Sequence, residues 1–189
     1  MTPLQLVLLL SVFFVCADAA LKPLPYNAAG TCCCGEKRQT RAFRWGSYYY
    51  QFFDCHKTWR QAQLHCNRHM NINGMTATGG RLVTIKSNSK NRWLRWIING
   101  HYGHDRYNIW IGLSRPHCHT NNWNWVGGGG LSYANWAQQQ PNCYWPPTER
   151  CVHLIDNYRW NDAECGDRFK FMCEIRAALF KATVVAPPG

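Results

Sequence analysis

The sequence predicts an α+β domain that is cross-linked by disulfides. Two segments with helical spacing, 56–69 and 87–100, come first, and short apolar runs typical of strands follow them. Ten cysteines lie beyond residue 20, and an even number in an exported chain favours disulfides over metal or redox chemistry. Between Ser114 and Pro147 the chain is mostly Gly, Asn, Gln, Trp and Pro, which predicts a long irregular loop region.

Residues 1–20 have the layout of a secretory signal peptide. An apolar run of 12 residues from Leu4 to Val15 leads to small residues that suit cleavage near Ala19 or Ala20. This run is short for a membrane span, and no later segment is apolar enough to cross a bilayer. The sequence therefore predicts a secreted, extracellular protein with no membrane span.

The Cys-rich N-terminal segment, 21–44, is also rich in Pro, Gly and charge, and we expect it to be irregular. The elements expected after it are a strand over 47–53, a helix over 56–69, a loop over 71–80, a strand over 81–87, a helix over 87–100, a strand over 108–113 and closing strands over 151–156, 158–162 and 169–175. In the second helix, the spacing predicts that Trp93, Trp96 and Ile97 face the core and that Lys90 faces solvent. Asn88 or Ser89 would cap this helix.

A set of short motifs occurs in one order along residues 45–176. They are Trp59-x-x-Ala62-x-x-x-Cys66, Gly80-Arg81-Leu82, Trp110-Ile111-Gly112-Leu113, Tyr133-x-Asn135-Trp136, Gln140-Pro141-Asn142, Glu149-x-Cys151, Trp160-Asn161-Asp162 and Phe171-x-Cys173-Glu174. In this order they resemble the C-type lectin domain family. The resemblance implies a C-type lectin-like fold over 45–176, in which two helices flank small antiparallel sheets and a long irregular loop region. Residues 177–189 are then a C-terminal tail.

The resemblance also implies how several cysteines pair. Cys66 would pair with Cys173, and Cys151 with Cys165. The two extra cysteines of the long loop region, Cys118 and Cys143, would pinch that region together.

The N-terminal cysteines are harder to assign. The longer form of the family adds an N-terminal hairpin disulfide, for which Cys34 and Cys55 are candidates. Two thiols among Cys32, Cys33 and Cys34 would then remain for bridges between chains in a disulfide-linked homo-oligomer.

Sugar-binding members of this family hold one calcium ion on the long loop, and two sugar hydroxyls complete its shell. Calcium takes six to eight oxygen ligands. The matching positions here all carry side-chain oxygen atoms, and they are Gln140, Asn142, Glu149, Asn161 and Asp162. By the same resemblance, the peptide bond before Pro141 is cis and aims its two neighbours at one ion. We therefore expect one calcium site that also binds the sugar.

The loop motif does not identify the sugar. Mannose-type members carry Glu-Pro-Asn and galactose-type members carry Gln-Pro-Asp, whereas this chain has Gln140-Pro141-Asn142. The two amides add no charge, so we expect weak calcium binding. Amides donate and accept hydrogen bonds, so they also impose no donor–acceptor asymmetry. Trp145 is expected to stack on the apolar face of a sugar, which tilts the prediction slightly towards galactose.

A second calcium site of the family is not expected in this chain. At the positions where that site needs acids, the sequence has Arg115, His119 and Arg150. Cofactor binding is therefore expected to be limited to a single Ca²⁺.

The charge distribution suggests a second class of partner. The formal net charge is +11, which becomes +12 when Asp18 leaves with the signal peptide. Between Lys37 and Arg115 there are fourteen Lys and Arg residues but two acids, whereas five of the ten acids lie between Glu149 and Asp167. Such a basic body attracts sulfated or other anionic polymers. A secreted, disulfide-rich chain seldom meets nucleic acid, so nucleic acid is not an expected partner.

The functional prediction is a calcium-dependent lectin that binds a hexose of galactose or mannose type on glycans, including microbial surfaces, in innate recognition. The alternative is a calcium-independent extracellular-matrix or biomineral-associated protein that uses the basic face. No serine or cysteine lies in a recognisable nucleophile context, so the sequence does not predict an enzyme.

Overall fold

The structure is a computed structural model, and it describes residues 41–101, 107–144 and 147–179. The chain divides after Cys33 into two units, and all described residues belong to the second. The signal peptide, Cys32, Cys33, Cys34 and Trp145 lie outside the described residues, as does most of the predicted tail.

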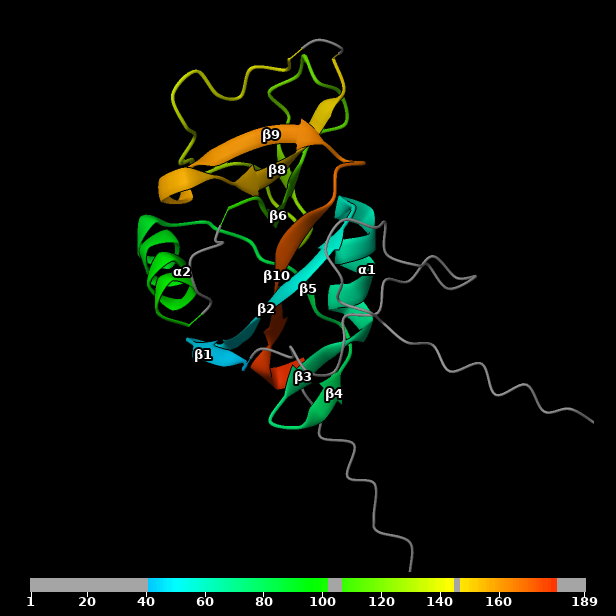
Figure 1. Ribbon diagram of the computed structural model, residues 1–189, viewed down its shortest axis with the longest axis vertical. Coiled ribbons are helices and arrows are strands. Elements are labelled where there is room, and N and C mark those ends of the chain that lie inside the picture. The colour runs from blue at the N-terminus through cyan, green and yellow to red at the C-terminus, as the bar shows by residue number, and fades with distance from the viewer. Residues whose placement is uncertain (1–40, 102–106, 145–146, 180–189) are drawn as a thin grey trace, which may run out of the picture. The chain divides into compact units, whose positions relative to one another are not determined.

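One mixed sheet forms the framework of the domain (Figure 1). Its strands are β1 (Phe43–Trp45), β2 (Tyr48–Lys57), β5 (Arg81–Leu82), β6 (Ile109–Ser114), β7 (Asn124–Trp125), β8 (Glu149–Leu154), β9 (Trp160–Glu164) and β10 (Phe169–Arg176). The order along the sheet is β1-β2-β10-β6-β8-β9, with β5 paired to β10 and β7 paired to β6. Only the pairing of β10 with β6 is parallel among these described strands. A separate hairpin consists of β3 (Met70–Ile72) and β4 (Met75–Ala77).

Two α-helices lie on opposite sides of the β2–β10 pair, as Figure 1 shows. Helix α1 (Trp59–Arg68) begins with a capping box, in which Thr58 and Gln61 each accept from the other's backbone N–H. Helix α2 (Asn88–His101) is capped by Ser87, whose hydroxyl accepts from the N–H of Lys90. Short 3-10 turns occupy Asp156–Tyr158 and Ala177–Leu179.

Each helix packs on its own hydrophobic cluster. Ala62 and Cys66 of α1 belong to a cluster with Trp110 and Phe171, whereas Leu94 and Ile98 of α2 belong to a second cluster that includes many aromatic side chains of the loop region and β9. In the second cluster, the ring of the fully buried Trp160 is 5.6 Å from that of Trp136 and 5.7 Å from that of Trp125. The long loop region is thus attached to the domain by tryptophan packing.

Several element predictions were wrong in detail. Trp96 is 64% exposed, whereas Lys90 is buried and its Nζ lies 2.6 Å from Oε2 of the fully buried Glu174. The expected orientation was therefore wrong at both positions, and at Lys90 the reason is the ion pair with a carboxylate that is distant in sequence. The cap is Ser87 and not Asn88 or Ser89. The expected loop over 71–80 instead contains the β3–β4 hairpin, whose three-residue strands are too short to show alternation.

Three disulfides connect described cysteines. Cys66 is bonded to Cys173, Cys151 to Cys165, and Cys118 to Cys143. These are the pairs that the sequence suggested. Cys55 is also disulfide-bonded.

Candidate functional site

The antiparallel pair β8–β9 carries three of the predicted ligand residues. Glu149 opens β8, and the register places Asp162 opposite Val152 and Asn161 opposite His153. Side chains alternate between faces along a strand, so Asn161 and Asp162 point to opposite sides of β9. Asp162 is completely buried.

The loop with the other two predicted ligands is bound to the same strand. The N–H of Ala137 donates to the carbonyl of Trp160 over 2.9 Å, and the N–H of Trp160 donates to the carbonyl of Asn135 over 2.9 Å. The peptide bond between Gln140 and Pro141 is cis. The chain then turns back so that the N–H groups of Asn142 and Cys143 reach Asp162.

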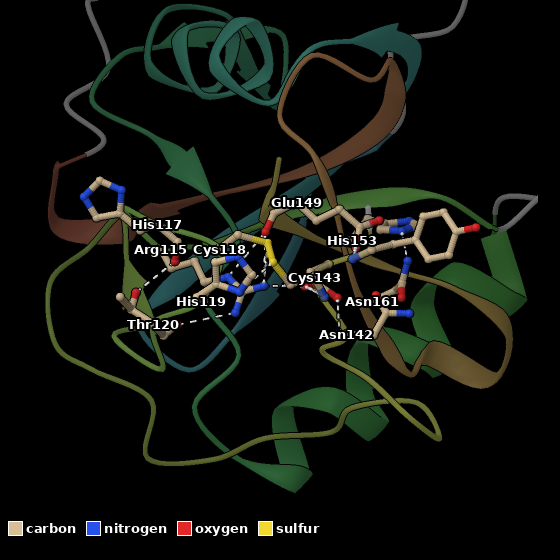
Figure 2. A network of polar contacts seen from close by, with 12 residues as sticks. Arg115, His117, Cys118, His119, Thr120, Asn142, Cys143, Glu149, His153 and Asn161 are labelled. Carbon is tan, nitrogen blue, oxygen red and sulfur yellow. Dashed lines mark hydrogen bonds and ion pairs between the residues drawn. A yellow bond between two sulfur atoms is a disulfide. The ribbon is translucent and has the colours of Figure 1, made fainter. Parts of the chain in front are cut away.

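Asp162 is the centre of this arrangement. Its Oδ1 accepts from the N–H of Asn142 over 3.1 Å, and its Oδ2 accepts from the N–H of Cys143 over 3.2 Å. Backbone donors of this kind stabilise the ionised form of a carboxylate. The Gln140-Pro141-Asn142 segment is therefore held directly against β9 (Figure 2).

The side chain of Glu149 also contacts the loop. Its Oε2 accepts from the N–H of Tyr144 over 2.6 Å. Burial raises the pKa of Glu149, the Tyr144 hydrogen bond lowers it, and the negative charge of Asp162 raises it further. The negative charge of Asp162 beside the Glu149 carboxyl group creates a demand for a positive charge at this place.

Arg115, which sequence reasoning did not include in the site, supplies such a charge. Its Nη2 lies 2.6 Å from Oδ2 of Asp162 and 3.1 Å from the carbonyl oxygen of Glu149. Figure 2 shows Arg115 beside Cys118 and Cys143, which are joined by a disulfide. The sequence signal was present, since Arg115 stands where a calcium-binding relative would have an acid. In the sequence, this arginine argues only against a second calcium ion. Its pairing with Asp162 could not be read from the sequence, because the two residues are 47 positions apart.

The remaining predicted ligands have different surroundings. The amide nitrogen of Asn161 lies 3.1 Å from Nε2 of His153, whose pKa burial lowers to about 4. Oε1 of Gln140 is buried and has no hydrogen-bond partner among the described residues. The structure thus brings Asn142 and Asp162 into direct contact and places Glu149, Asn161 and Gln140 on the segments around them.

These residues fit a calcium ion by the chemistry of their donors. The set consists of oxygen-bearing side chains, and the unpaired Oε1 of Gln140 is an acceptor that a cation would satisfy. The negative charge available to the ion is small, because the positive charge of Arg115 offsets that of Asp162, one of the two carboxylates. In the described ranges, no group of three or more His, Cys, Asp or Glu side chains is arranged to hold a metal ion.

A family model described as the lectin C-type domain matches residues 56–175. Lithostathine-1-alpha of Homo sapiens is 31% identical over 140 residues, which cover 72% of this chain and 76% of that protein. A protein named C-type lectin from Micrurus corallinus is 32% identical over 127 residues, covering 66% of this chain and 74% of its own. A solved structure of human lithostathine superposes with a TM-score of 0.60 at 29% identity, covering 71% of this chain and 96% of that one.

The relatives are binding proteins and not enzymes, and the fold is the one they share. In the part of the chain that the structure describes, no helix is long and apolar enough to cross a membrane. The family match covers both helices and strands β6 to β9, including every described residue of the candidate site. The chain is a member of the C-type lectin domain family.

Proposed function

We propose that the chain is a secreted lectin that binds a hexose with the help of one calcium ion. The site is formed by the Gln140-Pro141-Asn142 loop, Glu149 and Asn161, with the buried Asp162 beneath the loop. The observation that supports it most is the pair of hydrogen bonds from Asn142 and Cys143 to Asp162. They hold a segment that is distant in sequence against β9, as a shared binding site requires.

The relatives support a carbohydrate ligand. A relative from Oxyuranus scutellatus is named a C-type lectin mannose-binding isoform and is 29% identical over 79% of this chain and 88% of its own. The structure of the cow CD23 domain in the presence of a GlcNAc2Man3 oligosaccharide superposes with a TM-score of 0.58 at 27% identity, covering 72% of this chain and 93% of that one. Such ligands present vicinal hydroxyl groups.

The residues that would hold the ion are Gln140, Asn142, Glu149, Asn161 and Asp162. When bound, calcium supplies coordination positions for two vicinal sugar hydroxyls. The side chain of Asn142 is exposed and accepts or donates hydrogen bonds. Because Gln140 and Asn142 are both amides, the loop imposes no preference between mannose-type and galactose-type hydroxyl pairs. Stacking on Trp145 would favour galactose.

The biological use that we propose is innate recognition of microbial glycans. Affinity for repetitive surfaces would rise through oligomers linked by Cys32, Cys33 and Cys34. A ladder of species on a non-reducing gel that collapses on reduction supports this assembly, and a single monomer band under both conditions counts against it.

A glycan array with and without calcium tests the proposed function. We expect hexose binding in calcium that chelator abolishes. Asn142→Ala removes a side-chain ligand but leaves the backbone N–H to Asp162 in place, so it should bind sugar at least tenfold more weakly. Gln138→Ala, an exposed position in the same loop, is the matched control and should bind as the natural chain does. No retention of any hexose in calcium would contradict the proposal.

A second function is supported by the charge of the domain. Basic residues are concentrated before Arg115, and the cation nearest to Asp162 is already a side chain. These features favour a calcium-independent matrix or mineral-associated protein that binds sulfated or other anionic polymers. Retention on heparin in chelator, with elution by salt and an empty glycan array, would favour this second function.

A further inference from the structure

The guanidinium of Arg115 is enclosed by the candidate site. The Arg115 side chain is 4% exposed, and its Cζ lies over the ring of Trp123, 4.3 Å from the ring centroid. Its donors reach four groups, which are Oδ2 of Asp162, the carbonyl of Glu149, the carbonyl of Thr120 and Sγ of Cys118. Its own backbone N–H donates to the carbonyl of Arg150 over 2.9 Å. Strand β6 and the start of β8 therefore fix it from two sides.

Asp162 needs a positive charge whether or not calcium is present. Its side chain is 0% exposed, and an isolated buried carboxylate is strongly unfavourable. The same carboxylate holds the N–H groups of Asn142 and Cys143. A change in the cation at Asp162 is thus passed directly to the sugar-binding loop.

We propose that Arg115 is the resident cation of this site, which holds the loop over Gln139–Cys143 against Asp162 without calcium and lowers the affinity for calcium. The part of this inference that concerns calcium affinity rests on the proposed function, whereas the part that concerns the loop does not. A guanidinium 2.6 Å from Oδ2 places one positive charge next to any divalent ion that coordinates Asp162. Like charges at that range repel, and the repulsion is weakly screened in a buried site.

The arrangement separates two tasks that a single ion would otherwise perform. Arg115 keeps the loop folded, and calcium contributes only contacts to the ligand. The loop is closed covalently by the disulfide from Cys143 to Cys118, whose sulfur also accepts from Nη2 of Arg115. The binding surface of the free protein is therefore already assembled before calcium or sugar arrives.

Arg115→Met in the full chain tests the inference, because methionine keeps much of the length and removes the charge. Hydrogen exchange at the N–H groups of Asn142 and Cys143 is the first measurement. In chelator we expect protection in the natural chain and at least tenfold faster exchange in Arg115→Met, with protection restored by calcium. Calcium titration by calorimetry is the second, and Arg115→Met should bind calcium at least tenfold more tightly.

Two further variants keep the test decisive if Arg115→Met does not fold. Arg115→Lys keeps the charge but not the fork of donors, and should show intermediate protection. Arg115→Met combined with Asp162→Asn leaves no unpaired buried charge, and should fold but exchange rapidly at Asn142 and Cys143 with or without calcium. Arg92→Met, at an exposed position of α2, makes the same change in net charge and should change neither measurement.

The outcomes distinguish this inference from the proposed function. Equal protection of the natural chain and Arg115→Met in chelator overturns the role of Arg115. Equal calcium affinity of these two chains overturns the competition. If no chain binds calcium, the calcium component of the proposed function fails, while faster exchange in Arg115→Met still supports Arg115 as the cation that holds the loop.

Discussion

The amide nitrogen of Asn161 lies 3.1 Å from Nε2 of His153 on the neighbouring strand. The two residues are cross-strand partners, and the ring of His153 packs against the rings of Trp110 and Phe169. An amide nitrogen only donates, so Nε2 accepts and the amide oxygen of Asn161 faces the other way. His153 thus fixes the orientation of the Asn161 amide, and under the proposed function it is a positioning residue for that ligand.

His153→Phe should therefore weaken ligand binding without disturbing the packing. Phenylalanine retains ring contacts with Trp110 and Phe169 but leaves the Asn161 nitrogen without an acceptor, a loss of about 1–3 kcal/mol. We expect calcium and sugar affinity to fall about three- to tenfold, measured by calorimetry, with a melting temperature that changes by a few degrees. His153→Gln, whose side-chain oxygen is an acceptor, should recover part of the affinity. Unchanged affinity in His153→Phe would show that Asn161 takes no part in binding.

Gln140→Glu should make the stability of the domain depend on calcium. Oε1 of Gln140 is buried without a partner, so a carboxylate there would be an unpaired buried charge in chelator. Calcium would neutralise it, and each added carboxylate raises calcium affinity. We expect a lower melting temperature than the natural chain in chelator, a larger increase on adding calcium, and a shift of preference towards mannose on the array.

The exposed Gln138→Glu is the matched control for Gln140→Glu. It adds the same charge to the same loop and should not change the response to calcium. If both variants respond alike, the effect is one of net charge and Gln140 does not face the ion.

Removing the Cys118–Cys143 disulfide should loosen the loop region while the rest of the domain stays folded. The bridge joins positions 25 residues apart, for which the chain-entropy model gives about 3 kcal/mol. We expect Cys118→Ser with Cys143→Ser to lower the free energy of unfolding by up to that amount and to weaken sugar binding. Near-ultraviolet circular dichroism of the tryptophans and denaturant unfolding measure the two effects. A loss of all cooperative unfolding would contradict a local role.

His65 should make the domain less stable in acid. Its pKa in the folded state is lowered to about 3, first by burial and then by the positive charges of Lys57 and His69. An unfolded chain takes up this proton near pH 6.5, so between about pH 6.5 and 3 the unfolded form binds more protons than the folded form. The contribution of neutral His65 is complete above about pH 6.5 and is lost as the pH falls towards 3, by up to about 1.4 kcal/mol per pH unit.

His65→Phe removes this dependence and keeps the ring packing against Phe53 and Phe171, whose centroids lie 4.6 and 5.2 Å from that of His65. We expect the free energy of unfolding to fall less steeply between pH 6 and 4 in this variant, as measured by urea titrations. His117→Gln changes an exposed histidine that does not act on the pKa of His65, and it should keep the steep dependence. If the free energy of unfolding depends on pH equally in the natural chain and in His65→Phe, His65 is not the cause of the acid sensitivity.

The sequence predicted the framework well, because the landmarks that identify it are buried. Core residues such as Trp110, Cys66 and Cys173 are completely buried, and their spacing can be recognised in the sequence. Ion pairs between residues that are distant in sequence leave no such pattern in the sequence. The burial of Lys90 on α2 depends on Glu174, which lies 84 residues beyond it. Helical spacing alone gives no information on that carboxylate.

The residues of the candidate site are a prediction from the sequence, whereas the contacts among them come from the structure. The five oxygen-bearing residues follow from the family resemblance, and Asn142 does contact Asp162 in the structure. That Arg115 would enter from β6 and pair with Asp162 could not be inferred, because an arginine in a loop is usually solvated. The pairing becomes visible only when the register of β6 against β8, with Ser114 opposite Cys151, is known.

The pairing of β10 with β2 determines how this domain can be attached to a support. Arg176 lies opposite Tyr48, and the N–H of Ala177 donates to the carbonyl of Ser47 over 2.8 Å, so the described residues start and finish side by side. In Figure 1 the β8–β9 pair and the long loop region lie at the far end of the domain from β1. A linker joined at this edge of the domain would therefore leave the β8–β9 pair and the long loop region unobstructed, and copies grafted densely on a bead would all present that region outward.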